Sequence, residues 1–237
     1  MTRTNQTPEK KVLKLFNQIS PTYDHMNNVI SLGLHRRWRK LTMAKLQPKV
    51  GQLVIDVCCG TGDFAISLAK AVGPTGHVVG VDFSDKMLQI ARKKIFQKGF
   101  SRRVSLVKAD AMKLPFSNNT FSLATIGFGL RNVPDAKQVL SEMRRVITLG
   151  GQVACLETSR PQNLFIYFFW NLYFKIVPML AKLLVNHYRD YKYLQVTTKR
   201  FVSAKTLVKI FKQVGLKKIY YKVFTWGAAT LHIGYKS

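Results

Sequence analysis

With 237 residues, of which 47% are hydrophobic and 21% charged, the chain suits a folded protein with a full hydrophobic core, and wholesale disorder is excluded. The 38 lysines and arginines far outnumber the 11 aspartates and glutamates, so the formal net charge is +27. This charge favours a polyanionic partner, either nucleic acid or an anionic membrane surface, unless it reflects a basic bias shared by all proteins of the organism.

Residues 8–48 are predicted to form helices joined by a turn at Ser20 and Pro21. Strand and helix signals then alternate. The predicted strands are Leu53–Val57, Val78–Val81, Val104–Val107, Phe121–Ile126, Val153–Leu156, Ile219–Phe224 and Ala229–Tyr235. The predicted helices are Phe64–Ala71, a helix capped by Ser84 that reaches Lys98, Pro134–Val146 and Ala204–Val214, with a turn at Gly150 and Gly151. Because alternating strands and helices pair in parallel through right-handed crossovers, we expect a doubly wound α/β sheet.

One aromatic segment, Leu164–Val185, is long enough to cross a bilayer. Asn171, Lys175, Pro178 and Lys182 interrupt it, and lysines in the middle of a span are costly. Contact with a lipid surface, or burial in the core or in a homodimer interface, therefore fits better than a span.

The cysteines cannot form a disulfide framework, since Cys58 and Cys59 are adjacent and Cys155 lies far away in the sequence. This usage indicates a reducing compartment. The histidines are scattered without the spacing of a zinc site, so we expect no metal. The N-terminal residues lack the apolar block of a signal peptide, and we expect a cytoplasmic protein.

The first predicted strand ends in a glycine-bearing turn, Asp56–Asp63, and a helix follows. Gly60 and Gly62 let the backbone approach a ligand, and the helix N-terminus offers free N–H groups. Such a turn alone is often an ordinary connection. The next strand ends at Asp82, where a carboxylate can accept both hydroxyls of a ribose, and the third is followed by Asp110–Ala111. Together these positions predict a nucleotide site.

The turn lacks the third glycine of a dinucleotide site, because Gly62 is followed by Asp63, Phe64 and Ala65. An acidic residue just inside the helix would repel a pyrophosphate. It would tolerate or hold the cationic sulfonium and amino group of S-adenosylmethionine. The sign of this charge favours the methyl donor over NAD.

The runs Asp56–Asp63, Gly80–Ser84 and Asp110–Phe116 resemble class I S-adenosylmethionine-dependent methyltransferases in general. Further runs resemble the narrower demethylmenaquinone/ubiquinone C-methyltransferase family, namely Tyr23–Asn27, Ser31–Trp38, Gly127–Val133, Tyr191–Leu194 and Thr225–Lys236. The chain departs from the family pattern at Thr148–Gly151, which lacks a proline, and at Glu157–Ser159, which lacks a phenylalanine. Both departures bear on the acceptor side.

The resemblance implies a Rossmann-like class I methyltransferase sheet, mostly parallel with an antiparallel last strand. It implies a single methyltransferase domain over residues 1–237, with residues 1–48 as a helical N-terminal cover and residues 160–200 as an aromatic and basic insertion. It further implies that Thr61, Asp82, Asp110 and Ala111 contact the donor. Thr61 would lie near the methionine moiety, Asp82 would bind the ribose, and Asp110 the adenine amino group.

The implied reaction is carbon methylation of a polyprenyl quinol. The ring hydroxyl ionises, the adjacent carbon attacks the methyl group, and the enzyme aligns the reactants and stabilises the phenolate. Arg131 is the candidate stabiliser, with a structural ion pair as the alternative. Tyr23 and Asp24 are expected to cover the site, and Tyr23 serves either in chemistry or in packing alone.

Three histidines, His25, His35 and His232, could each act as a base, but a lone histidine is more often structural. A polyprenyl quinol stays in the bilayer, so its enzyme must reach the membrane surface. Apolar residues of Leu164–Val185 are followed by basic residues suited to lipid phosphates, namely Arg189, Lys192, Lys199 and Arg200. We therefore expect peripheral attachment to an anionic membrane.

A nucleic-acid methyltransferase is the main rival function, since the net charge suits RNA. The fourth strand, however, ends in Ile126–Gly129 without the Asn/Asp-Pro-Pro-aromatic tetrapeptide that holds a flipped base, and no Pro-Cys pair is present. We therefore expect no nucleic-acid partner. A scaffold without catalysis is the third reading, and the intact Asp56, Gly60, Gly62 and Asp82 argue against it.

Overall fold

The structure is a computed structural model that describes residues 4–173, 193 and 196–237. The chain begins with three helices, α1 (Glu9–Ile19), α2 (Tyr23–Ser31) and α3 (Leu34–Leu46). A 3-10 turn over Ser20–Thr22 joins α1 to α2, with Pro21 in its first positions. The helices and the turn predicted for this segment are confirmed.

A seven-stranded sheet follows, with strand order β3-β2-β1-β4-β5-β7-β6. In chain order its elements are β1 (Leu53–Val57), α4 (Asp63–Ala71), β2 (His77–Asp82), α5 (Asp85–Gln97), β3 (Val104–Lys108), β4 (Phe121–Gly127), α6 (Ala136–Val146), β5 (Ile147–Thr158), α9 (Ala204–Gln213), β6 (Leu216–Phe224) and β7 (Ala229–Lys236). The last strand, β7, runs antiparallel to both β5 and β6, and the other neighbouring pairs are parallel. The predicted fold class is confirmed.

Several predicted boundaries differ from the structure, among them the start of β6, at Leu216 rather than Ile219. Helix α6 begins at Ala136 rather than at Pro134, because the side chain of Asp135 caps it by accepting a hydrogen bond from the Gln138 N–H at 3.0 Å. The turn predicted at Gly150 and Gly151 is wrong. Both glycines lie inside β5, in a stretch where its pairing with β4 shifts register.

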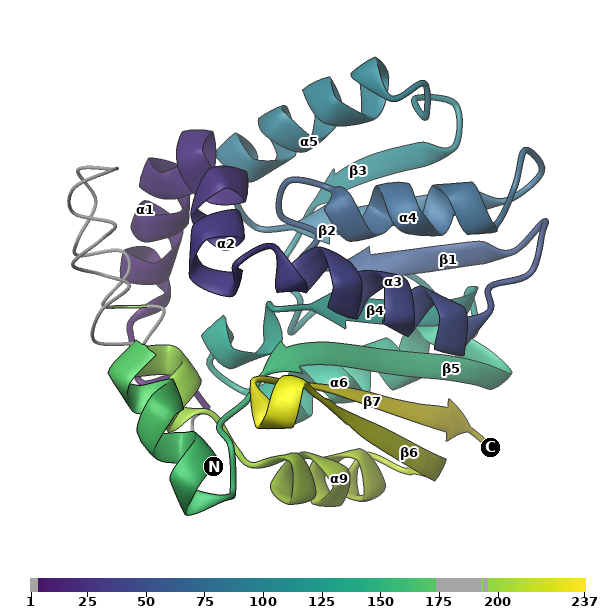
Figure 1. Ribbon diagram of the computed structural model, residues 1–237. Helices are drawn as coiled ribbons and strands as arrows, with labels where there is room; N and C mark the ends of the chain where they lie inside the picture. Colours follow the sequence, from purple (N-terminus) through teal and green to yellow (C-terminus); the bar gives the residue numbers. More distant parts are fainter. Residues whose placement is uncertain (1–3, 174–192, 194–195) are drawn as a thin grey trace.

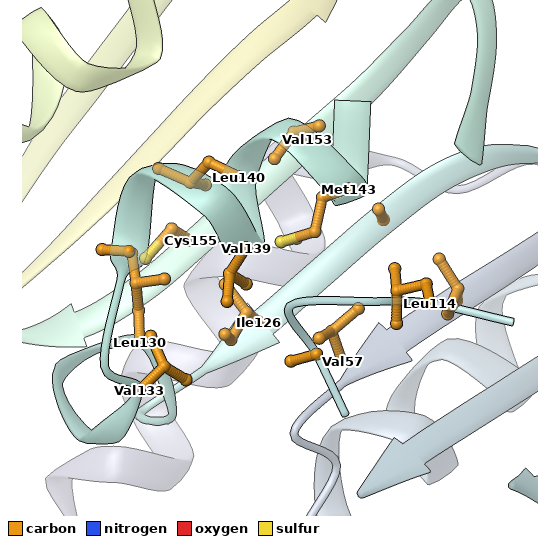
Figure 2. Packing of buried hydrophobic residues seen from close by; sticks show 14 of the residues in the cluster. Val57, Leu114, Ile126, Leu130, Val133, Val139, Leu140, Met143, Val153 and Cys155 are labelled. Carbon is orange, nitrogen blue, oxygen red and sulfur yellow. The ribbon is translucent and has the colours of Figure 1, made fainter. Parts of the chain in front are cut away.

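Helices cover both faces of the sheet. On one face α6 and α9 pack against the strands, and Figure 2 shows Val139, Leu140 and Met143 of α6 beside Ile126 and Val153 of the sheet. On the other face the buried side chains of α3, α4 and α5 form a second core cluster, which includes Trp38, Leu68 and Ile95. The sheet is thus buried on both faces, as the alternation of strands and helices predicts.

The N-terminal helices stand at the edge where the parallel strands end. In Figure 1, α1 and α2 lie beside the arrowheads of the central strands. Ligands bind at this edge in open α/β sheets. In α1 and α2, Val12, Phe16, Ile19 and Met26 pack with Met87 of α5. These contacts fix the cover over the strand ends.

Residues 164–173 form a helix whose apolar side chains are largely exposed. Its exposed members are Leu164, Phe165, Phe168, Phe169 and Leu172. Residues 174–185 of the predicted aromatic segment, together with Arg189 and Lys192, lie outside the described residues. None of the helices within residues 4–173 and 196–237 has the length and apolar character needed to cross a membrane.

Candidate active site

The turn between β1 and α4 has an unusual backbone. Gly60 and Gly62 have φ angles of 55° and 83°, and a Cβ added at Gly62 would lie 3.2 Å from the Cβ of Ala91 in α5. Cys58 also has a positive φ, 54°, a region that residues with side chains rarely adopt. Packing holds this turn in a shape that presents backbone to the end of the sheet.

Asp82, the last residue of β2, ties the turn to the neighbouring strand. Its two carboxylate oxygens each accept a backbone hydrogen bond, one from Gly60 N–H and one from Ser84 N–H, both at 2.9 Å. The side chain is buried, and this burial raises the pKa of Asp82 to about 6 in spite of those bonds. Each oxygen keeps a second lone pair for an incoming hydroxyl.

A cavity of about 300 Å³ opens at this edge. It is lined by predicted donor residues from three strand ends, namely Gly60, Asp82, Asp110 and Ala111. Much of its remaining lining is apolar and includes Val12, Leu13 and Phe16 of α1, Phe83, Met87, Met112 and Phe128. The cavity therefore has a polar end, lined by the predicted donor residues, and an apolar wall on the side of α1.

A smaller hollow of about 50 Å³ adjoins the cavity, and Tyr23, Cys58 and Gly60 line both. The predicted donor residues Asp56 and Thr61 line this hollow. The structure thus brings together the donor residues predicted from the sequence, with Gly62 placed as the N-cap of α4 between them.

Asp56 lies beneath the turn, almost fully buried. One carboxylate oxygen accepts a hydrogen bond from the Thr125 hydroxyl at 2.8 Å, while the other has no partner among the described residues. Burial raises the pKa of Asp56 to about 7, and the bond from Thr125 only partly opposes this. A buried oxygen without a partner suits a ligand's ammonium or hydroxyl group.

Asp63 is not free to hold the cationic sulfonium, as the argument from its charge expected. Its two oxygens bind Lys94 at 2.8 Å and Arg39 at 2.9 Å. Burial alone would raise the pKa of Asp63, yet the two cations hold it below its usual value. Since its charge is already balanced, the preference for a sulfonium cannot rest on this residue.

Arg131 follows β4, as predicted, and is buried. Its Nη1 donates to a carboxylate oxygen of Glu157 at 2.5 Å and to the Phe128 carbonyl at 2.7 Å, while its backbone N–H donates to the other Glu157 oxygen at 3.1 Å. The ion pair considered as the alternative role is therefore present. Nε of Arg131 is buried and finds no acceptor within the described part of the chain.

Tyr23 lies against Gly60 of the donor turn and within electrostatic range of Arg131, which itself lines neither hollow. Tyr23 lines both the cavity and the smaller hollow. Burial raises the pKa of its hydroxyl, and the nearby Arg131 guanidinium and Asn27 offset this only in part. The hydroxyl stays protonated at neutral pH and is available as a hydrogen-bond donor.

Of the three candidate histidines, His232 and His35 are buried, whereas His25 is exposed and lines neither hollow. His232 is fully buried, stacks on Tyr221 and contacts the Ala204 carbonyl at 3.0 Å, outside both hollows. His35 lines the smaller hollow and contacts the Ser31 hydroxyl at 2.7 Å. Burial lowers the pKa of each to about 4. No group of three metal-binding side chains is found among residues 4–173, 193 and 196–237.

The sequence analysis did not identify the residues that form ion pairs with the predicted site residues. Glu157, Arg39 and Lys94 were not identified as parts of the site, nor were the α1 side chains that form the cavity wall. Glu157 could have been found, because a carboxylate at the end of a buried central strand requires a cation nearby. The other contacts depend on how the N-terminal helices fold back over the sheet.

A seven-stranded sheet with one antiparallel strand, a glycine turn and an acidic residue at the end of β2 define a class: this is an S-adenosylmethionine-dependent methyltransferase. A methyltransferase of this kind from Aquifex aeolicus has a similar fold, with a TM-score of 0.60 and 18% identity over 83% of this chain and 88% of that one. The chain belongs to the ubiE/COQ5 methyltransferase family, whose pattern matches residues 4–236.

Two bacterial relatives are similar over nearly their whole length. The demethylmenaquinone methyltransferase of Lactobacillus johnsonii is 49% identical, covering 100% of this chain and 97% of the relative. That of Lactiplantibacillus plantarum is 48% identical and covers 94% of both chains.

Proposed function

We propose that this enzyme transfers the methyl group of S-adenosylmethionine to a ring carbon of demethylmenaquinol, with a ubiquinone-precursor benzoquinol as a second acceptor to be tested. The observation that carries the proposal is the cavity, in which a polar nucleoside end meets an apolar wall from α1. The full-length similarity to two proteins named demethylmenaquinone methyltransferase supports it.

Each predicted donor residue binds a different part of S-adenosylmethionine. Asp82 accepts hydrogen bonds from the ribose hydroxyls through the lone pairs that Gly60 and Ser84 leave free. Asp110 accepts from the adenine amino group and Ala111 forms an apolar contact beside it. Thr61 and the free oxygen of Asp56 face the methionine end from the smaller hollow. This donor set, with carboxylates at Asp56, Asp82 and Asp110, fits a nucleoside that carries hydroxyl, amino and ammonium groups.

The acceptor end needs a group that stabilises negative charge. When the quinol hydroxyl loses its proton, the adjacent carbon attacks the donor's methyl, the sulfur–methyl bond breaks, and the ring regains aromaticity by losing the hydrogen on that carbon. Arg131 lowers the energy of the phenolate through its positive charge, and Glu157 holds the guanidinium in one orientation. Since Glu157 balances part of that charge, the oriented N–H groups of Arg131 contribute as well.

Tyr23 completes the acceptor side as a hydrogen-bond donor. Its raised pKa keeps the proton on the hydroxyl, so Tyr23 orients a ring oxygen rather than removing a proton. Its place in the lining of both hollows suits contact with both substrates.

The protein also needs access to a lipid-soluble acceptor. The exposed aromatic side chains of residues 164–173 lie on a helix at the same end of the molecule as α1 (Figure 1). Lys199 and Arg200 and the net charge of +27 add attraction to anionic headgroups. We take this helix to rest on the membrane surface without crossing it.

A parallel mass-spectrometric assay tests the acceptor. Short-chain demethylmenaquinol, the corresponding demethylated benzoquinol and total RNA are offered with the same donor. Methylation of demethylmenaquinol without methylation of RNA is expected. Methylated RNA with unchanged quinols would overturn the proposal.

A further inference from the structure

A carboxylate from the N-terminal cover occupies part of the donor site. Asp24, in the first turn of α2, accepts a hydrogen bond from the Thr61 hydroxyl at 2.6 Å and from Lys94 Nζ at 2.5 Å. Lys94 also donates to the Thr61 hydroxyl oxygen at 3.1 Å. Residues from α2, the donor turn and α5 thus converge on one carboxylate.

This arrangement has the chemistry of a carboxylate-binding site. It offers a hydroxyl donor and an ammonium group, and Thr61 directly precedes Gly62, the N-cap of α4, whose N-terminal N–H groups favour a negative charge. The site lies at the smaller hollow, which opens from the nucleoside cavity. S-adenosylmethionine carries one carboxylate, at the methionine end that Thr61 is proposed to contact.

The charges leave no place for an additional carboxylate. Lys94 and Arg39 are balanced by Asp24 and Asp63. A third carboxylate beside these two would meet like charge, which is destabilising at such distances. One of the resident carboxylates must therefore give way when a ligand carboxylate enters.

Asp24 is the residue that can leave. Asp63 binds a different cation with each oxygen and lies on α4 against the sheet. The Asp24 side chain is 41% exposed, whereas that of its partner Lys94 is 19% exposed. Rotation of the Asp24 side chain would place its charge in water and would leave Lys94 and Thr61 in position.

We propose that Asp24 is a stand-in for the donor's carboxylate: it occupies the carboxylate subsite formed by Lys94 and Thr61 until the methionine carboxylate displaces it. The inference rests on the proposed function in that the donor is S-adenosylmethionine.

Calorimetry without acceptor tests this, using S-adenosylmethionine and its decarboxylated form, which keeps the amino group. Asp24→Asn removes the competing charge with little change in shape, so affinity for S-adenosylmethionine is expected to rise about threefold to tenfold. Affinity for the decarboxylated form should change less than twofold. Lys94→Gln should weaken S-adenosylmethionine at least tenfold and leave the decarboxylated form nearly unchanged.

Asp85→Asn is the matched control, since Asp85 also pairs with a lysine, Lys108, at an exposed site on α5. Its affinity for either ligand should match the wild type. A loss of affinity for both ligands in Asp24→Asn would overturn the inference and would instead show that Asp24 binds the amino group. Unchanged affinity for S-adenosylmethionine in a folded Asp24→Asn variant would also overturn it. If the wild type binds neither ligand, the proposed donor site itself fails.

Discussion

At the scale of single residues, Asp82 links the electrostatics of the buried strand end to ligand binding. Its carboxylate already accepts two backbone hydrogen bonds, yet burial still raises its pKa to about 6. Ribose hydroxyls donate better to the ionised carboxylate than to the acid. Proton binding and donor binding therefore compete at this side chain.

A first prediction concerns the affinity for S-adenosylhomocysteine. Asp82→Ala should weaken binding by about 1.5–3 kcal/mol, the range for hydrogen bonds to a charged group, or roughly 10–150-fold. In the wild type, protonation of Asp82 should lower affinity towards tenfold per pH unit below pH 6, in addition to any loss that protonation of Asp56 causes as the pH falls through about 7.

Calorimetry between pH 5 and pH 8 measures both effects, with Asp82→Asn as the shape-matched control whose binding should not follow this titration. A change of less than threefold in Asp82→Ala would remove Asp82 from the donor site.

The second prediction concerns Arg131 and Glu157. Its test must distinguish a loss of turnover from a loss of stability. Removing Arg131 alone leaves a buried carboxylate unpaired, at a cost of about 3–5 kcal/mol in stability. The double variant Arg131→Gln with Glu157→Gln removes both charges together and should stay folded. We expect its turnover to drop about 100–1000-fold, the loss typical of a preorganised donor, with normal binding of S-adenosylhomocysteine.

The pH profile is the second readout of this double variant. Without Arg131, turnover should continue to rise into the alkaline range, because hydroxide then ionises the quinol unaided. Arg131→Lys should recover little, since an ammonium cannot reproduce the planar fork. Wild-type turnover in the folded double variant would leave the pair with a purely structural role.

The residues predicted for the donor site share a place along the chain. Asp56 and Asp82 lie near the ends of β1 and β2, Gly60 and Asp110 follow β1 and β3, and the strand ends of a parallel sheet meet at one edge. The charge partners depend on contacts between distant segments, such as Asp24 with Lys94, which are 70 residues apart. Local patterns carry no information about such pairs.

At the scale of elements, the turns after β1 and β4 support each other. A Cβ added at Gly129 would lie 2.6 Å from the Cβ of Cys58, well inside contact distance. Cys58 is part of the donor turn and already has a positive φ. The donor turn therefore keeps its shape only if position 129 has no side chain.

The third prediction follows from this contact. Gly129→Ala should lower the free energy of unfolding by about 1–3 kcal/mol, the cost of overpacking, and should also weaken S-adenosylhomocysteine binding. Gly76→Ala is the matched control, because its Cβ would meet Val72 at 2.5 Å, far along the chain from the donor turn. It should lose stability while folded protein binds normally. Thermal unfolding measures the stability of both variants, and calorimetry measures their affinity for S-adenosylhomocysteine. Equal affinities of the two variants would contradict the coupling between Gly129 and the donor turn.

Element boundaries were predicted where local signals are strong. The hydroxyl of Ser84 caps α5 as predicted, accepting from the Met87 N–H at 3.2 Å, because its capping chemistry is local. The extent of β5 was missed, since Gly150 and Gly151 signal a turn, whereas β5 pairs with β4 on both sides of them, at Ile147 and again from Gln152.

At the scale of the whole molecule, charge and exposed aromatic side chains act together. Phe165, Phe168 and Phe169 are exposed on the helix over residues 164–173, and the net charge is +27. In the proposed membrane attachment, the charge would draw the protein to anionic headgroups over a range set by salt, and apolar burial of the helix would then hold it there.

The fourth prediction is that vesicle binding rises with anionic lipid content and falls with salt. Co-sedimentation measures it, and Phe165→Ser with Phe168→Ser should reduce binding to anionic vesicles. The matched control is Phe96→Ser, because Phe96 is 75% exposed but lies on α5. Equal binding to neutral and anionic vesicles at every salt concentration would refute the electrostatic part of this account.

The central claim is that a ring carbon of a reduced quinol receives the donor's methyl group, and isotope tracing tests it most directly. The enzyme is given S-adenosylmethionine with a ¹³C-labelled methyl group and short-chain demethylmenaquinol, kept either reduced or oxidised. The account predicts labelled methyl on the ring carbon of the reduced acceptor, no product from the oxidised one, and little product with Asp82→Ala. Label on a quinol oxygen, or equal methylation of both redox forms, would contradict it.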